Sequence, residues 1–351
     1  ENMDKNDILK ELRGKLGDSP EENEKMLREA GEKYAAEGNL DGVNAVGELL
    51  LEQMPEDRKK EIERLTHIDG VRIDQYHQKI VDLIEAKKAL QALPLAEKLY
   101  NKITTEYAHT ENAKFVSLRN PFEDNLCQIL FKDDRILNRT PFDFSSYITT
   151  YAYLLVETGS NIDAIPVLET AIEYNPVDVA PRFELCEVYK LIRNKRMVIE
   201  VSRDTLKVAS SPIAIARCYA NIGYILTSFA DFEDAGVFYT ASVMFAPNKG
   251  VAFEMQHLSD LKGSPIMRPT QQQLINTMKK YDIDFGPDKT VIEVCAQLSS
   301  HFLSKKDFPN ALQALKMTYN LTRDEHVKEL ILKIDPNSPM FRPAQDAAPQ
   351  Q

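Results

Sequence analysis

The sequence predicts an all-α fold, an α-solenoid superhelix of antiparallel helix pairs. The stretch "NIDAIPVLETAIEYNP", beginning at Asn161, recurs 71 residues later within "DFEDAGVFYTASVMFAPN", with small residues and a proline in the same relative places. Glycine occurs only 13 times, while alanine, leucine, glutamate and lysine are abundant, which favours helix. A chain of 351 residues built from repeats needs no second globular core.

Five small or β-branched residues mark the start of the second helix of successive pairs. Two of the spacings are 34 residues, from Ala164 to Val198, and 37 residues, from Val198 to Ala235. The other two markers are Ala92 and Ala311. These markers predict helix pairs at 24–57, 73–106, 145–178, 179–212, 216–249 and 292–325, with a degenerate pair at 250–287 around the irregular "SPIMRP". The count is about twelve to fourteen helices.

Each marker follows a helix that also carries small or aromatic residues at a spacing of 3.6 residues. Two short helices approach closely only where small side chains meet, and a proline ends the second helix. We therefore expect Ala164, Ala171, Gly223 and Ala235 to be buried where paired helices cross.

This pattern resembles the tetratricopeptide repeat (TPR), a helix–turn–helix unit of roughly 34 residues. The chain departs from the family pattern in having no tryptophan. The resemblance implies a right-handed superhelix of stacked hairpins.

The segment 110–144 breaks the repeat. It contains Pro121 and Pro141, and "KFVSL" alternates apolar and polar residues as a strand does. We expect an insertion that is partly extended, resembles a hairpin and holds the chain's only extended segment. The predicted domains are an N-terminal helical region at 1–109, the insertion at 110–144, a C-terminal array at 145–334 and a disordered tail at 335–351.

The composition indicates a soluble protein and narrows its partners. The hydrophobic fraction is 43%, which is too high for a disordered chain. The net charge of −11 disfavours nucleic acid as a partner. No apolar run approaches the roughly 20 residues of a membrane span, and no signal peptide is evident. The four cysteines show no CxxC pair, which favours unpaired thiols and a reducing, cytoplasmic location; a removed N-terminal segment would leave export open.

The sequence carries no pattern typical of an enzyme. It lacks the phosphate-binding, zinc-protease and Gly-x-Ser-x-Gly motifs. His67 and His77 lie ten residues apart, nearly on opposite sides of a helix, so they do not form a metal site. We therefore expect neither catalysis, nor a cofactor, nor a bound metal.

The resemblance implies a binding surface on the first helices of successive hairpins. Carried onto this chain, the peptide-binding positions are Tyr153, Phe183, Glu187, Lys190, Arg217, Asn221 and Tyr224. The alternative for Phe183 and Tyr224 is that they only fill the gap between hairpins. The family's carboxylate-gripping subgroup is excluded, because Thr149 and Tyr153 replace the required donors and Glu184 would repel a carboxylate.

The sequence therefore favours a non-enzymatic scaffold that binds a protein or an extended peptide in a concave groove. The alternative is a peptide-sensing regulator resembling the TPR quorum-sensing receptors. Residues 1–20 are too short and too acidic for the DNA-binding module that those receptors carry. Self-assembly into a homo-oligomer stays open.

Overall fold

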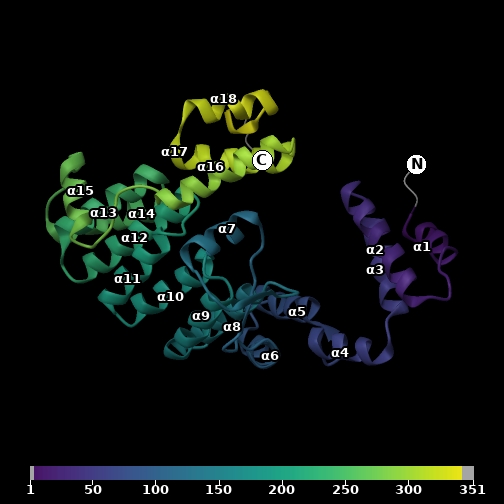
Figure 1. The fold of residues 1–351 in the computed structure, drawn as a ribbon. Helices are drawn as coiled ribbons and strands as arrows, with labels where there is room; N and C mark the ends of the chain where they lie inside the picture. Colours follow the sequence, from purple (N-terminus) through teal and green to yellow (C-terminus); the bar gives the residue numbers. More distant parts are fainter. Residues whose placement is uncertain (1–3, 342–351) are drawn as a thin grey trace, which may run out of the picture. The chain divides into compact units, whose positions relative to one another are not determined.

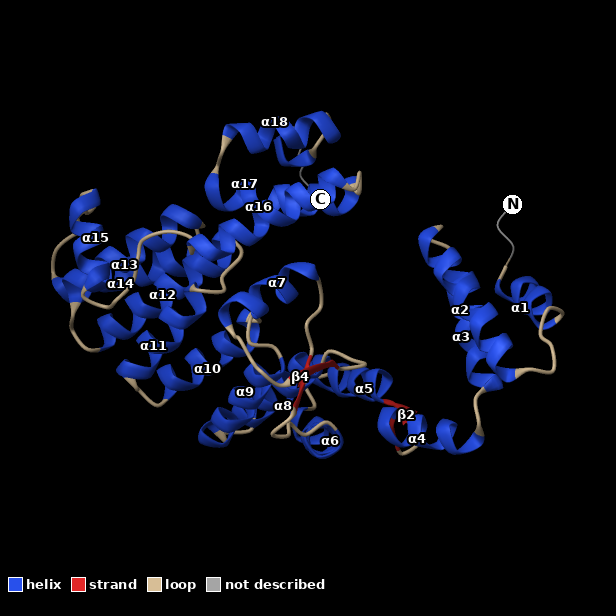
Figure 2. Cartoon of the chain, viewed as in Figure 1, coloured by secondary structure: helices blue, strands red, loops and turns tan. Residues whose placement is uncertain are grey.

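The computed structural model describes residues 4–341, in which eighteen α-helices account for most of the chain (Figure 1, Figure 2). The chain divides into two compact units between Tyr76 and His77. Each unit is described by itself below. The predicted all-α fold class is confirmed.

The first unit is a helix pair with an additional helix packed against it. Helices α2 and α3 pair with each other, and α1 packs on α3 around a core that includes Ile8, Leu27 and Leu49. A Cβ atom at Gly42 would lie 2.3 Å from the ring of Tyr34, so this crossing requires glycine. The elements are α1 (Lys5–Arg13), α2 (Pro20–Ala36), α3 (Leu40–Gln53), α4 (Glu56–Thr66), β1 (His67–Ile68) and β2 (Val71–Arg72).

The second unit begins within helix α5 (Ile73–Glu85), where the division falls, and contains the longer run of helix pairs. Its pairs pack in sequence order, α8 with α9, α10 with α11, α12 with α13, and α16 with α17. The helices are α6 (Ala89–Glu106), α8 (Phe144–Glu157), α9 (Asn161–Tyr174), α10 (Val179–Leu191), α11 (Lys195–Leu206), α12 (Pro212–Ser228), α13 (Phe232–Phe245), α14 (Lys249–Lys262), α15 (Gln271–Lys279), α16 (Lys289–Ser304), α17 (Phe308–Thr322) and α18 (Glu325–Ile334).

The repeat markers lie where the sequence places them. All five have no exposed surface: Ala92, Ala164, Val198, Ala235 and Ala311. Equivalent serine–alanine contacts also tie two of the pairs together, with the serine on opposite helices. Ser145 of α8 donates to the carbonyl of Ala171 on α9, and Ser242 of α13 donates to that of Ala216 on α12. The predicted close crossings are confirmed.

The number of helices exceeds the predicted twelve to fourteen. Fourteen of the eighteen described helices correspond to the seven predicted pairs, and the additional ones are α1, α4, α7 (Pro121–Leu130) and α18. These four carry no repeat marker. A count based on the marker spacing therefore omits them.

The insertion is not a hairpin, which corrects the expectation. Strands β3 (Ala113–Val116) and β4 (Ile136–Arg139) are parallel, with Ala113 opposite Ile136, and α7 forms the crossover between them. Parallel strands cannot be joined by a tight turn. Nor is it the only extended segment, because β1 and β2 form a short antiparallel pair.

The helix of the insertion packs against a distant part of the array. Helix α7 contacts α16, and Leu126 and Cys127 belong to the same buried cluster as Val294 and Cys295 (Figure 1). One of the two prolines that suggested irregular structure, Pro121, instead begins a helix, where the side chain of Asn120 accepts a hydrogen bond from the backbone N–H of Glu123; Pro141 lies in the loop before α8.

The prediction of disorder from residue 335 was wrong for residues 335–341. A 3₁₀ turn (η1, Pro339–Phe341) follows α18, and the ring of Phe341 packs edge-on to Tyr319, 5.1 Å between centroids. The rest of the predicted tail, 342–351, lies outside the described residues.

Candidate functional site

A row of charged and aromatic side chains connects α10 with α12. The guanidinium of Arg217 lies 4.3 Å from the ring centroid of Phe183 and 3.6 Å from the carboxylate of Glu187. Glu187 accepts a hydrogen bond of 2.8 Å from Lys190, whose ammonium lies 5.1 Å from the ring centroid of Tyr224. The row brings together five of the seven predicted residues. We call it the α10–α12 row.

The α10–α12 row borders a hollow of about 590 Å³ between α10, α12, α13 and the start of α14. Arg217, Lys190 and Tyr224 line it, and Leu191 and Ile213 add exposed apolar surface at 58% and 73% exposure. Two cations of the row share one carboxylate, Glu187, and Glu254 of α14 supplies a second. The four charges of the lining therefore balance.

The sixth predicted residue, Asn221, lies on the wall of the same hollow. Its side chain is 4% exposed, and its amide nitrogen has no hydrogen-bond partner among the described residues. A buried amide normally makes hydrogen bonds, since leaving one unmade costs roughly 1–3 kcal/mol. This orphaned donor is therefore a feature that the fold alone does not explain.

Tyr239 of α13 adds a second buried polar atom to the hollow, and the sequence prediction missed it. The residue is 1% exposed, and its hydroxyl makes no hydrogen bond of normal geometry within residues 4–341. Burial raises the pKa of the Tyr239 hydroxyl. Thr227 lowers this pKa and Glu254 raises it, so the side chains of Thr227 and Glu254 lie near the hydroxyl. Tyr239 lies on a second helix, whereas the family resemblance places ligand contacts on first helices.

The seventh predicted residue, Tyr153, lies one hairpin away. It is 37% exposed and lines a separate hollow of about 300 Å³ with Thr149, Asp178 and Glu184. Burial raises the pKa of Glu184, while Arg217 lowers it. The carboxylate of Glu184 thus lies within electrostatic range of both Tyr153 and the α10–α12 row. Phe183 is 7% exposed, so it supports Arg217 more than it offers a contact surface.

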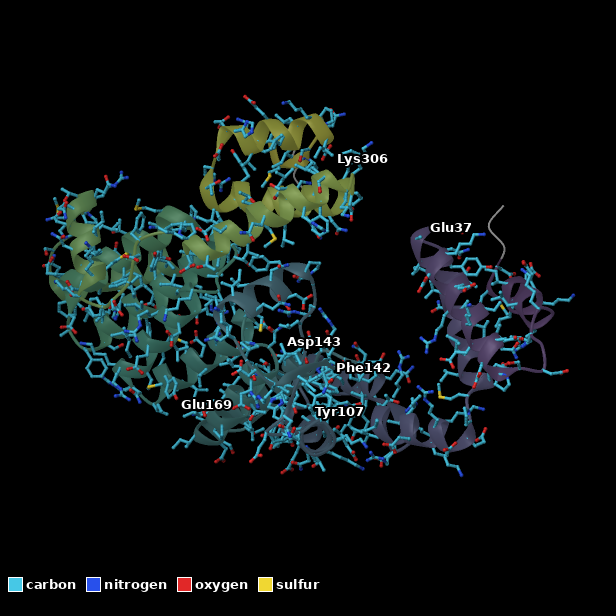
Figure 3. All side chains as sticks on the ribbon, viewed as in Figure 1. Glu37, Tyr107, Phe142, Asp143, Glu169 and Lys306 are labelled. Carbon is cyan, nitrogen blue, oxygen red and sulfur yellow. The ribbon has the colours of Figure 1, made fainter. Side chains whose placement is uncertain are left out.

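A buried polar network fixes the insertion to the array. Arg119 donates to Glu123 at 2.6 Å and lies 3.3 Å from Asp178, and Glu123 in turn accepts a hydrogen bond of 3.0 Å from Asn175. Burial would lower the pKa of Arg119, but the surrounding carboxylates raise it overall. Asp143, labelled in Figure 3, lies 3.7 Å from Arg119, and the ring of Phe144 lies 6.2 Å from that of Phe142 and 4.7 Å from that of Tyr107 between centroids. The network is therefore a structural connection between the insertion and the array.

The described residues contain no group of three or more His, Cys, Asp or Glu side chains placed to hold a metal ion. The four cysteines are free and buried, and burial raises their pKa values, to about 11 for Cys186 and about 12 for Cys295. Thiols with a raised pKa are poor nucleophiles. None of the described helices is long and apolar enough to span a membrane.

Comparison with known proteins yields fold neighbours only among solved structures. No protein-family model matches the chain, and no curated protein sequence matches it significantly. A tetratricopeptide repeat protein from Parabacteroides merdae is 12% identical, with a TM-score of 0.40 over 90% of this chain and 99% of its own.

Two further structures are similar at the same level of identity. The C-terminal part of a TPR repeat-containing protein from Cytophaga hutchinsonii has a TM-score of 0.38 at 12% identity, covering 86% of this chain and 98% of its own. The structure of the APC/C hetero-tetramer Cut9–Hcn1 has a TM-score of 0.32 at 12% identity, and the match covers 88% of this chain and 63% of the other. The TPR-like architecture of this chain rests on its own hairpins and buried markers.

Proposed function

We propose that this protein is a non-enzymatic interaction scaffold that holds an extended segment of a partner protein along the α10–α12 row. The observation that carries the proposal is the row itself. Side chains from two successive first helices form one connected line beside a hollow of about 590 Å³. Tyrosine and arginine, two members of the row, are the residue types enriched in binding hot spots.

The chemistry of the row suits an extended peptide. Its backbone carbonyls need donors, which Arg217 and Lys190 supply, and its apolar side chains need surface, which Leu191, Ile213 and Tyr224 leave exposed. The net charge of −11 makes a protein segment a better partner than nucleic acid. Tyr153 and Glu184 would extend the same surface by one hairpin.

The proposal is tested with peptides selected from a displayed library of random dodecapeptides. Peptides recovered on the wild-type chain are titrated by calorimetry against Arg217→Glu. The substitution removes the stack on Phe183 and places a carboxylate beside Glu187, so we expect affinity to fall about tenfold or more.

Arg196→Glu is the matched control, because Arg196 lies on the second helix α11 with its side chain 80% exposed. It should change the affinity less than about twofold. Equal losses for the two variants, or no selectable peptide, would contradict a binding surface along the row.

A further inference from the structure

The hollow beside the α10–α12 row has a polar floor, in which the Asn221 amide nitrogen has no hydrogen-bond partner among the described residues and the Tyr239 hydroxyl has Thr227 and Glu254 near it without a hydrogen bond of normal geometry. Asn221 and Tyr239 are 4% and 1% exposed, lie on facing helices α12 and α13, and have no partner of normal geometry among the described residues. Both line the same space. Two such atoms in one cavity indicate a place where an outside group, or water in its absence, completes the hydrogen bonds.

Glycine at position 223 makes this floor possible. A Cβ atom there would lie 2.9 Å from the ring of Tyr239, closer than packing allows, so only glycine lets the ring lie across α12. The phenol then ends beside the hollow, near Thr227 and Glu254. The position of the hydroxyl is therefore set by the hairpin crossing and does not depend on a flexible side chain.

The floor suits a neutral group better than an ion. Its own atoms are an amide and a phenol, and the charged residues of the lining balance, with Lys190 and Arg217 both engaged by Glu187. A carboxylate would be repelled by Glu254, which lies near the Tyr239 hydroxyl, and an ammonium has only donors, so it could not accept from the Asn221 amide. A neutral group that both accepts and donates would satisfy Asn221 and Tyr239 together.

We propose that this hollow is a specificity pocket for a carboxamide side chain, glutamine or asparagine, of the bound segment. The carboxamide oxygen accepts from the Asn221 amide, and its NH₂ group donates to the Tyr239 hydroxyl or to Glu254. The apolar stem of the side chain packs along Ile213 and Val251 at the entrance. The inference rests on the proposed function for the identity of its ligand, but its test needs no partner peptide.

The test uses three capped amino acids that share one backbone: N-acetyl-glutamine, N-acetyl-glutamate and N-acetyl-leucine methylamides. Each is titrated at millimolar concentration into the full chain labelled with ¹⁵N-asparagine, and the side-chain amide of Asn221 is followed by NMR. We expect a saturable shift with the glutamine compound, and binding about tenfold tighter than that of the other two. The Asn221→Leu variant identifies the NMR resonance of the Asn221 side-chain amide, because that signal is missing from its spectrum. Tyr239→Phe keeps the ring packed on Gly223 but removes the hydroxyl, so it should abolish the preference for the glutamine compound.

The other outcomes overturn the proposal. Equal binding of the three compounds would show recognition of the backbone amide, tighter binding of the glutamate compound would show an anion site, and the absence of a saturable shift would leave no pocket. Asn221→Leu should also raise the melting temperature, because it removes an unpaired buried amide; a lower value would show that the fold itself uses the amide. If Arg217→Glu did not weaken peptide binding, the proposed function would fall, but the titrations with the capped amino acids would still test the pocket.

Discussion

A single half-buried histidine, His77, shows how one residue can make stability depend on pH. The ring of His77 stacks on Tyr147 with centroids 4.1 Å apart, and its Nε2 lies 3.0 Å from the Thr150 hydroxyl. Burial lowers its pKa to about 4, against 6.5 in an exposed position. The folded chain therefore holds His77 neutral at pH values where the unfolded chain protonates it.

We expect the stability contribution of His77 to be complete above pH 6.5 and to be lost as the pH falls towards 4. The unfolded state binds more protons in this window, so the free energy of unfolding should fall by about 2–3 kcal/mol between pH 7 and pH 4.5. His77→Gln should reduce this slope. Urea unfolding followed by circular dichroism at several pH values measures it.

His257 provides the control for this prediction, since it is exposed on α14. His257→Gln should leave the pH profile of the wild type unchanged. Identical profiles for the wild type and His77→Gln would show that His77 does not contribute.

At the scale of elements, the insertion helix α7 is a structural part of the array. Leu126 is fully buried in the cluster that also contains Val294 and Cys295 of α16. Leu126→Ala would open a cavity there, and such changes cost about 2–5 kcal/mol. We expect a lower unfolding midpoint in urea and faster hydrogen exchange in residues 289–304.

Ile129 is the matched control on the same helix, because its side chain is 45% exposed. Ile129→Ala should cost less than about 1 kcal/mol. If Leu126→Ala left both the midpoint and the exchange of α16 unchanged, α7 would not be packed on α16 in solution.

At the scale of the whole molecule, two buried clusters each lie within one unit. The cluster of the first unit lies between Ile8 and Leu49, and the large cluster of the second lies between Leu126 and Leu321. A cluster that lies within one unit can form without residues of the other, which favours folding of the second unit on its own.

We expect the fragment of residues 73–351, which keeps α5 whole, to fold without the first unit. Its far-ultraviolet circular dichroism should be helical and its thermal transition cooperative, with a midpoint within a few degrees of the main transition of the full chain. Loss of the cooperative transition would contradict separate folding. The predicted domain boundaries at 109/110 and 144/145 stay a prediction.

The sequence by itself determined the repeat, and through it the fold class and the helix pairs. Ala164 and Ala235 lie at crossings because only small side chains let two helices approach, a constraint that is local and recurs in every copy. The resemblance to the tetratricopeptide repeat then placed Glu187, Lys190, Arg217 and Tyr224 on first helices. These are contacts within a hairpin or between neighbouring hairpins, so a periodic pattern contains them.

Only the tertiary structure decided the contacts between segments far apart in the chain. The pairing of β3 with β4 and the packing of α7 on α16 depend on how the chain returns to itself. No local periodicity encodes such a return, because the free energy comes from surface that is buried only after the array has formed. Within a hairpin, the missing partner of the Asn221 amide also required the tertiary structure, because the repeat pattern fixes the positions of helices and not the geometry of side-chain hydrogen bonds.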